Sequence, residues 1–306
     1  MDRRSEQESM CLIKTETGAK TRTDKKTAIL AVSFGTSYKE TREQTIGAIE
    51  KAVQSAFPQY GVRRAFTSRV IIKIMKTREG VEIDSVEEAL LRAEADGIRR
   101  LAVLSTHVMD GYEYHDLKAL MKKHAFRFDR LLFSGPLLSE ESDFDSVVSA
   151  VADRAAPYLD GKTAVCFLGH GTGADSNAVY GKIQNKLRET GNGHCFVGTV
   201  EAGPTAEEVI KELDARGIYN HVVMKPLMVV AGEHANNDMA GGEDSWRARF
   251  ERAGYKVTCL MEGLGQMPEI QEIYVRHVRD LFEDEDRFTV TGTGGKEKPD
   301  FAEEQR

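Results

Sequence analysis

Four side chains suited to metal binding or proton transfer stand at or just beyond the ends of apolar segments. His170, Glu201 and His234 follow such segments in the second half of the chain, and Glu113 follows one in the first half. Loops at the carboxyl ends of parallel strands gather at one edge of a sheet, so we expect these side chains to converge. Two imidazoles with one or two carboxylates suit a borderline divalent ion. A histidine after a strand also often serves only in capping or packing.

A second interpretation uses the stretch from Gly169 to Ala174, GHGTGA, which matches a degenerate dinucleotide fingerprint. Glu201 then stands where an acid that binds ribose would end the next strand. This hypothesis gives the His234 and Glu113 loops no role. Gly161-Lys162-Thr163 resembles the end of a phosphate-binding loop, but Ala156 replaces the required glycine and a strand follows, so we reject ATP binding.

Strand-type segments alternate with helical patterns along most of the chain. The strand segments are residues 27–33, 62–67, 101–109, 130–134, 163–168, 195–200, 221–230 and 255–261. The helical patterns cover residues 38–56, 85–95, 112 to beyond 120, 143–154, 205–216 and 268–282. Nearly continuous apolar strands that alternate with helices are typical of parallel sheets covered on both faces. The sequence therefore predicts the α/β class.

The two halves look like copies of one unit. SFGT at residues 33–36 aligns with GHGT at 169–172, and DGYE at 110–113 aligns with AGEH at 231–234. In this alignment His170 corresponds to Phe34, and His234 corresponds to Glu113. We therefore expect polar groups to face each other across a central cleft.

Composition limits the kinds of partner. The net charge is −7, with both signs mixed along the chain, so no nucleic-acid or membrane partner is expected. Four cysteines without a CxxC pair suit reduced thiols. The first 26 residues, which lack a secretory apolar region, predict a disordered extension, and residues 285–306 a tail. We expect a cytoplasmic protein.

The quoted stretches together resemble the anaerobic sirohydrochlorin cobaltochelatases of the CbiK type. The similarity rests on AVSFGTSY, RAFTSRVIIK, DGYEY, GPLLS, GHGT, VEAGP, PLMVVAGEHANNDM, GEDSW and EGLGQMPEI, in this order from Thr27 to Phe282. It implies two three-layer αβα halves, 27–138 and 139–266, related by a pseudo-two-fold axis around a cleft. It also implies that the last helix, 267–284, belongs with the first half.

The resemblance further implies that Co²⁺ is inserted into sirohydrochlorin, or a close precorrin-2 relative, without ATP. His170 and His234 carry over as metal ligands and catalytic residues, with Glu113 as their acidic catalytic partner and Glu201 as a further acidic candidate for the metal. Which of the two acids is a ligand and which is a base stays open. No organic cofactor is expected. Iron insertion for sirohaem and a non-catalytic metal or tetrapyrrole carrier remain alternatives, and a homo-oligomer stays open.

Contacts to the tetrapyrrole are expected from three places in the first half. The arginine contacts, in the basic stretch RRAFTSR at residues 63–69, are inferred from charge, because arginine matches a carboxylate well. A solvated helix face is the alternative for that stretch. The expected residues are Ser33, Phe34, Thr36, Arg63, Arg64, Ser68 and His107.

Overall fold

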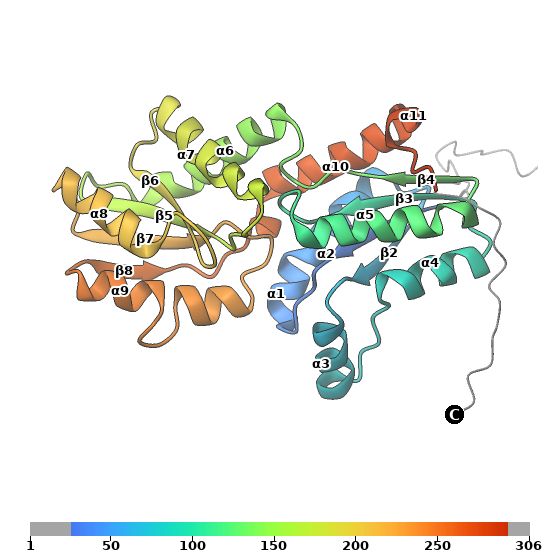
Figure 1. The fold of residues 1–306 in the computed structure, drawn as a ribbon, viewed down its shortest axis with the longest axis horizontal. Coiled ribbons are helices and arrows are strands. Elements are labelled where there is room, and N and C mark those ends of the chain that lie inside the picture. Colours follow the sequence, from blue (N-terminus) through green and yellow to red (C-terminus); the bar gives the residue numbers. More distant parts are fainter. Residues whose placement is uncertain (1–25, 293–306) are drawn as a thin grey trace, which may run out of the picture.

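The computed structural model describes residues 26–292, which form two four-stranded parallel sheets (Figure 1). The strands of the first sheet are β1 Thr27–Ser33, β2 Gly61–Phe66, β3 Arg100–Ser105 and β4 Arg130–Phe133. Those of the second are β5 Thr163–Gly169, β6 Cys195–Thr199, β7 His221–Pro226 and β8 Lys256–Cys259. The orders β2-β1-β3-β4 and β6-β5-β7-β8 are the same topology. The predicted α/β class with two similar halves is confirmed.

Helices cover both faces of each sheet. They are α1 Lys39–Gln44, α2 Ile46–Ala56, α3 Arg69–Glu79, α4 Val86–Ala95, α5 Tyr112–His124, α6 Glu141–Ala155, α7 Ala178–Glu189, α8 Ala206–Arg216, α9 Trp246–Arg252, α10 Pro268–Glu283 and α11 Glu285–Phe288. Residues of α4 and α5 pack on one face of the first sheet, and those of α8 and α9 on one face of the second. The other face of each sheet packs into a single core together with α2, α6, α7 and α10.

The apolar run of β1 shows why alternation is absent from the strand sequences. Ile29 points into the core shared by the halves, whereas Leu30 points into the core under α4 and α5. Both side chains are buried. Because each face of the sheet is covered, all positions from Ala28 to Val32 are apolar.

The chain exchanges helices between the halves. After β4 it crosses to α6, which packs against α7 and α10, and after β8 it returns with α10, which packs against α2 and β3. In Figure 1 the red-orange α10 lies beside the strands of the first half, although it is formed near the end of the chain. Tyr274 of α10 donates from its hydroxyl to the carbonyl of Thr106, just after β3, at 2.9 Å. One hydrophobic core therefore joins both halves.

Several boundaries differ from the sequence prediction. The strands expected over 101–109 and 221–230 end at Ser105 and Pro226, and the residues beyond them form loops. The helix expected over 38–56 is divided at Thr45, whose hydroxyl donates to the carbonyl of Thr41 at 2.6 Å. Helix α7 was not predicted from the sequence.

The tail expected from residue 285 is wrong at its start. Glu285 begins α11 and pairs with Arg100 at the start of β3. The backbone N–H of Val290 donates to the carbonyl of Leu131 in β4 at 2.8 Å. Residues 285–290 therefore belong to the first half. Residues 293–306, and residues 1–25 of the expected extension, lie outside the described part of the chain.

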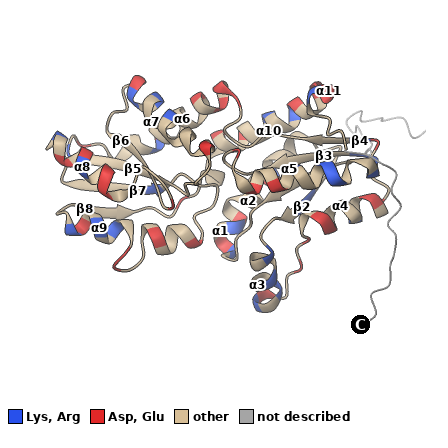
Figure 2. Ribbon diagram, viewed as in Figure 1, with Lys and Arg blue, Asp and Glu red and all other residues tan. Residues whose placement is uncertain are grey.

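Charged side chains of both signs are spread over the helices of both halves (Figure 2). In this view both halves carry residues of both signs along their ribbons. Within residues 26–292, none of the helices combines the length and the apolar character needed to cross a bilayer.

A buried carboxylate ties α6 to α10. Asp143 lies 3.2 Å from Nε2 of His277 and 2.5 Å from Nη2 of Arg276, and it accepts from the backbone N–H of Glu140 at 2.8 Å. Burial disfavours its charged form, but His277, together with Glu140 and Arg276, outweighs that effect and lowers the pKa of Asp143 to about 2. The ionised carboxylate therefore stabilises the folded state.

Replacing Asp143 by Asn should lower the free energy of unfolding by about 3 kcal/mol at neutral pH, because Arg276 and His277 lose their carboxylate partner. The folded-state pKa lies below the ordinary value of 3.8, so this contribution is complete above that value and is lost as the pH falls through about 2. Urea unfolding of both proteins should therefore show a difference in midpoint that shrinks in acid.

The matched control is Asp153→Asn, because Asp153 lies on the exposed side of the same helix. That variant should unfold as the parent does. An equal loss in the control, or a difference for Asp143→Asn that does not change with pH, contradicts the role given to Asp143.

Candidate metal centre

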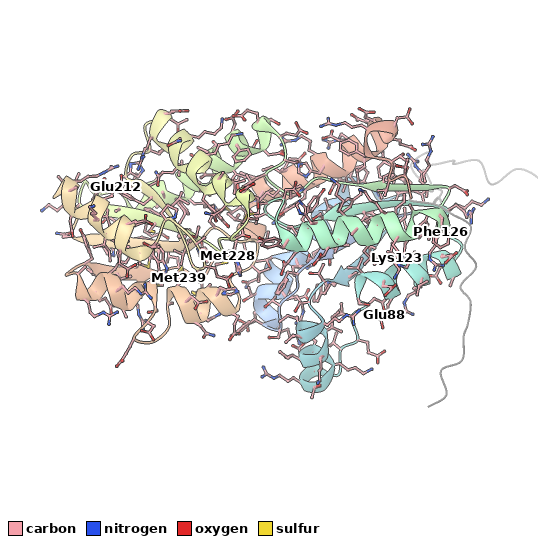
Figure 3. The ribbon with its side chains drawn as sticks, in the orientation of Figure 1. Glu88, Lys123, Phe126, Glu212, Met228 and Met239 are labelled. Atoms are coloured by element: carbon pink, nitrogen blue, oxygen red, sulfur yellow. The ribbon has the colours of Figure 1, made fainter. Side chains whose placement is uncertain are left out.

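A cavity of about 530 Å³ opens between the two halves, at the carboxyl ends of β1, β3, β5 and β7. Much of its wall is apolar. Phe34 is 46% exposed there, and Val108, Met109 and Met228 also line it. Figure 3 labels Met228 on the side of the second half that faces the first. The volume of the cavity lies within the range of roughly 300–1,000 Å³ typical of ligand pockets, and the apolar wall suits a large flat ligand.

Two histidines meet at the wall of this cavity. His170 directly follows β5, and His234 caps the N-terminus of a single π-helical turn, Ala235–Met239. Their Nε2 atoms lie 3.0 Å apart, and the two rings stand perpendicular, with centroids 4.3 Å apart. The strand-end prediction that His170 and His234 converge is correct at the level of these atoms.

The hydrogen bonds of the two Nδ1 atoms determine the tautomer of each ring. Nδ1 of His170 lies 2.9 Å from the carbonyl of Gly171, which only accepts, so this nitrogen carries the proton and donates. Nδ1 of His234 donates in the same way to Oδ2 of Asp238 at 2.8 Å. With Nδ1 as the donor on each ring, the neutral form of either histidine directs an Nε2 lone pair at the other ring. Two lone pairs at this separation repel each other unless a cation lies between them.

Glu201 adds an oxygen ligand to this pair. Its Oε1 lies 3.6 Å from Nε2 of His170, and one ligand atom from each of His170, Glu201 and His234 falls within 4.8 Å of the others. A tetrahedral ion about 2.0–2.1 Å from each imidazole would hold the two nitrogens roughly 3.3 Å apart, close to the spacing found. The side chains of His170 and His234 are 41% and 37% exposed, so an ion could enter and leave.

The first half contributes an acid and a third histidine. Glu113 lies in the first turn of α5, and Oε2 of Glu113 is 3.8 Å from Nε2 of His107. Burial raises the pKa of Glu113, with nearby acids adding to the effect and His170 and His234 opposing it. Burial also lowers the pKa of His107 to about 4. Glu113 and His107 both line the cavity, as expected.

The expected substrate contacts divide into two groups. Ser33, Phe34, Thr36 and His107 line the cavity. Arg63, Arg64 and Ser68 do not, so the cavity gives that part of the prediction no support. Ser68 instead caps α3, where its hydroxyl accepts from the backbone N–H of Ile71 at 3.3 Å.

Arg63 and Arg64 have structural partners. Arg63 pairs with Asp96 at 2.7 Å, and Arg64 pairs with Glu50 at 2.6 Å. Both lie in the middle of β2, whereas the cavity collects residues beyond the strand ends. A guanidinium already paired in this way is not free to bind a carboxylate of a ligand.

The sequence prediction assigned no role to two residues of the site. The hydroxyl of Tyr38, from the first half, donates to Oε2 of Glu233, from the second, at 3.1 Å across the cavity. Asp238 holds the ring of His234. A signal for Asp238 was present, because an acid four residues after a histidine shares its face in a helical turn.

The structure also bears on the dinucleotide interpretation. In such a fingerprint the helix opens within the glycine motif, so that its N-terminus meets the pyrophosphate. Here α7 begins only at Ala178, beyond Gly173 and Ala174. His170 occupies the second position of the motif and is directed at His234. The loop therefore does not form a phosphate-binding helix terminus.

The paired sheets, with a cavity between them, define the chelatase fold. SirB from Bacillus subtilis, solved with Fe³⁺, matches with a TM-score of 0.63 and 18% identity, covering 87% of this chain and 99% of that one. At this identity the likeness shows the fold alone.

Sequence comparison then defines the family. The model of the cobalt chelatase (CbiK) family matches residues 27–283, and the chain belongs to this family. The sirohydrochlorin cobaltochelatase of Salmonella typhimurium is 36% identical over 254 residues, covering 83% of this chain and 95% of that protein. The sirohydrochlorin cobaltochelatase CbiKC of Nitratidesulfovibrio vulgaris is 29% identical over 256 residues, covering 83% and 89%.

Replacing Asp238 by Asn should weaken Co²⁺ binding by about 10–100-fold, because the carboxylate fixes the tautomer and orientation of the His234 ring. Calorimetric titration of the protein with Co²⁺ alone measures this effect without turnover. Asp244→Asn, in the exposed loop that follows, should bind Co²⁺ as the parent does. Unchanged affinity in Asp238→Asn would contradict the orientation of His234 by this carboxylate.

Proposed function

We propose that this protein inserts Co²⁺ into sirohydrochlorin, or a close precorrin-2 relative, without ATP. The observation that carries the proposal is the facing pair of Nε2 lone pairs on the wall of a large apolar cavity. Membership of the cobalt chelatase family and the names of the two relatives support cobalt as the substrate metal.

In this proposal, His170, His234 and Glu201 bind the incoming ion. Two neutral nitrogens and one carboxylate replace some of its water and leave positions open for the macrocycle. The ligands are partly exposed and bring only one negative charge, so the site holds the ion without enclosing it. Such a site can release the ion to four tetrapyrrole nitrogens.

The macrocycle would lie in the cavity between the apolar walls, with Phe34 of the first half on one side and Met228 of the second half on the other. Insertion requires two pyrrole protons to leave. Glu113 is placed to receive protons, because burial raises its pKa and so favours the protonated form more than an exposed glutamate would. His170 and His234 serve the reaction by presenting the metal to the ring.

A metal or tetrapyrrole carrier would use the same ligands but would stop at one equivalent. The visible spectrum of sirohydrochlorin with Co²⁺ and protein, without nucleotide, separates these functions by the number of turnovers. Parallel reactions with Fe²⁺ test iron insertion for sirohaem, since the nitrogen and oxygen ligands by themselves accept several divalent ions. Faster turnover with Fe²⁺ than with Co²⁺ at matched concentration would favour the iron reaction.

Replacing His170 or His234 by Ala should lower the rate of Co²⁺ insertion at least about 100-fold, because either change removes half of the imidazole pair that holds the ion. The double variant should be little slower than either single one, since the two rings act as a unit. His115→Ala is the control, because His115 pairs with Asp110 at 2.9 Å and lies outside the cavity lining. Parental rates in either single variant would remove that histidine from the site.

A further inference from the structure

His107 is buried with one ring nitrogen left over. Its side chain is only 8% exposed, and its Nε2 has no hydrogen-bond partner among the described residues. His107 lines the cavity. Buried polar atoms are almost always paired, so an unpaired imidazole nitrogen at a cavity wall indicates a partner that binds there.

The rest of the His107 ring is firmly held. Nδ1 lies 2.9 Å from the hydroxyl of Ser105, and the backbone N–H of Ser105 is in turn bonded to the hydroxyl of Ser134 at 2.9 Å. The carbonyl of His107 accepts from the backbone N–H of Leu137 at 2.7 Å. A serine hydroxyl can donate or accept, so the ring keeps its partner at Nδ1 whether Nε2 carries a proton or a lone pair.

A carboxylate with access to solvent lies close to Nε2 of His107. Oε2 of Glu113 lies 3.8 Å away, and the Glu113 side chain is 55% exposed. A short rotation or one water would connect the two groups. Glu113 can therefore take a proton from His107 and pass it to solvent.

We propose that His107 is the group that takes the pyrrole protons directly, and that Glu113 relays them to water. This inference rests on the proposed chelatase function and adds a catalytic residue to it. In this arrangement the second half holds the cation, and the first half removes the protons.

The proton balance of the step is simple. Each pyrrole N–H bond breaks, its electron pair stays on nitrogen and forms a bond to Co²⁺, and the proton moves to Nε2 of His107. The proton passes to Glu113 and then to water before the second follows. One doubly charged ion enters for two protons released, so no oxidant, reductant or nucleotide is needed.

The acid–base properties of the pair agree with this direction of transfer. Burial lowers the pKa of His107 to about 4, so the ring is neutral at physiological pH and free to accept a proton. Burial raises the pKa of Glu113, so its carboxylate holds a proton more readily than an exposed glutamate does. Glu113 is therefore suited to receive the proton from His107.

The test uses the full-length protein with Co²⁺ and sirohydrochlorin. His107→Ala and His107→Gln should each lower the rate of insertion about 100-fold or more, because neither side chain accepts a proton. Added imidazole should restore a large part of the rate to His107→Ala, where the missing ring leaves space, and little to His107→Gln. Calorimetric affinity for Co²⁺ alone should equal that of the parent in both variants, which also shows that they fold.

His115→Gln, at an exposed histidine of α5, is the matched control and should keep the parental rate. The inference is overturned if His107→Gln inserts Co²⁺ at the parental rate. It is equally overturned if imidazole fails to rescue His107→Ala, or if Co²⁺ affinity falls together with the rate, since His107 would then be structural or a metal ligand. Failure of the parent protein to insert Co²⁺ refutes instead the proposed function.

Discussion

The candidate site depends on one electrostatic constraint: the two Nε2 lone pairs that face each other at 3.0 Å. Each is imposed from behind, by the carbonyl of Gly171 and by the carboxylate of Asp238, which take up the Nδ1 protons. The arrangement is repulsive on its own and becomes favourable when a cation binds. The fold brings the two imidazoles together by fixing His170 at the end of β5 and His234 at the start of a π-helical turn after β7. Such turns are rare and often occur at functional sites.

Much of this could be predicted from the sequence, because strand ends obey a simple geometric rule. Continuous apolar runs identified the parallel strands, and His170, Glu201, His234 and Glu113 stood just beyond them. Parallel strands bring such positions to one edge, so convergence followed without any knowledge of packing. The same rule correctly placed Phe34 at the cavity.

The errors arose where a residue type was judged without its partners. Arg63 and Arg64 look like an anion site in the sequence, but Asp96 and Glu50 neutralise them, and ion pairs between distant segments leave no local pattern. Two predicted strands ran too far because apolar residues continue beyond the strand ends into the loops that line the cavity. α7 was overlooked although Tyr180, Ile183 and Leu187 have helical spacing, because a long polar loop separates it from β5.

The exchange of α6 and α10 has a consequence for how the polypeptide matures. The first sheet lacks the cover of α10 until residues near 283 have left the ribosome, well after its own strands have been made. Until then the core that contains Ile29 and Leu104 is packed by α2 and α6 but lacks the apolar side chains of α10. The two lobes thus complete each other at the end of synthesis, and a chain released early would expose an aggregation-prone surface.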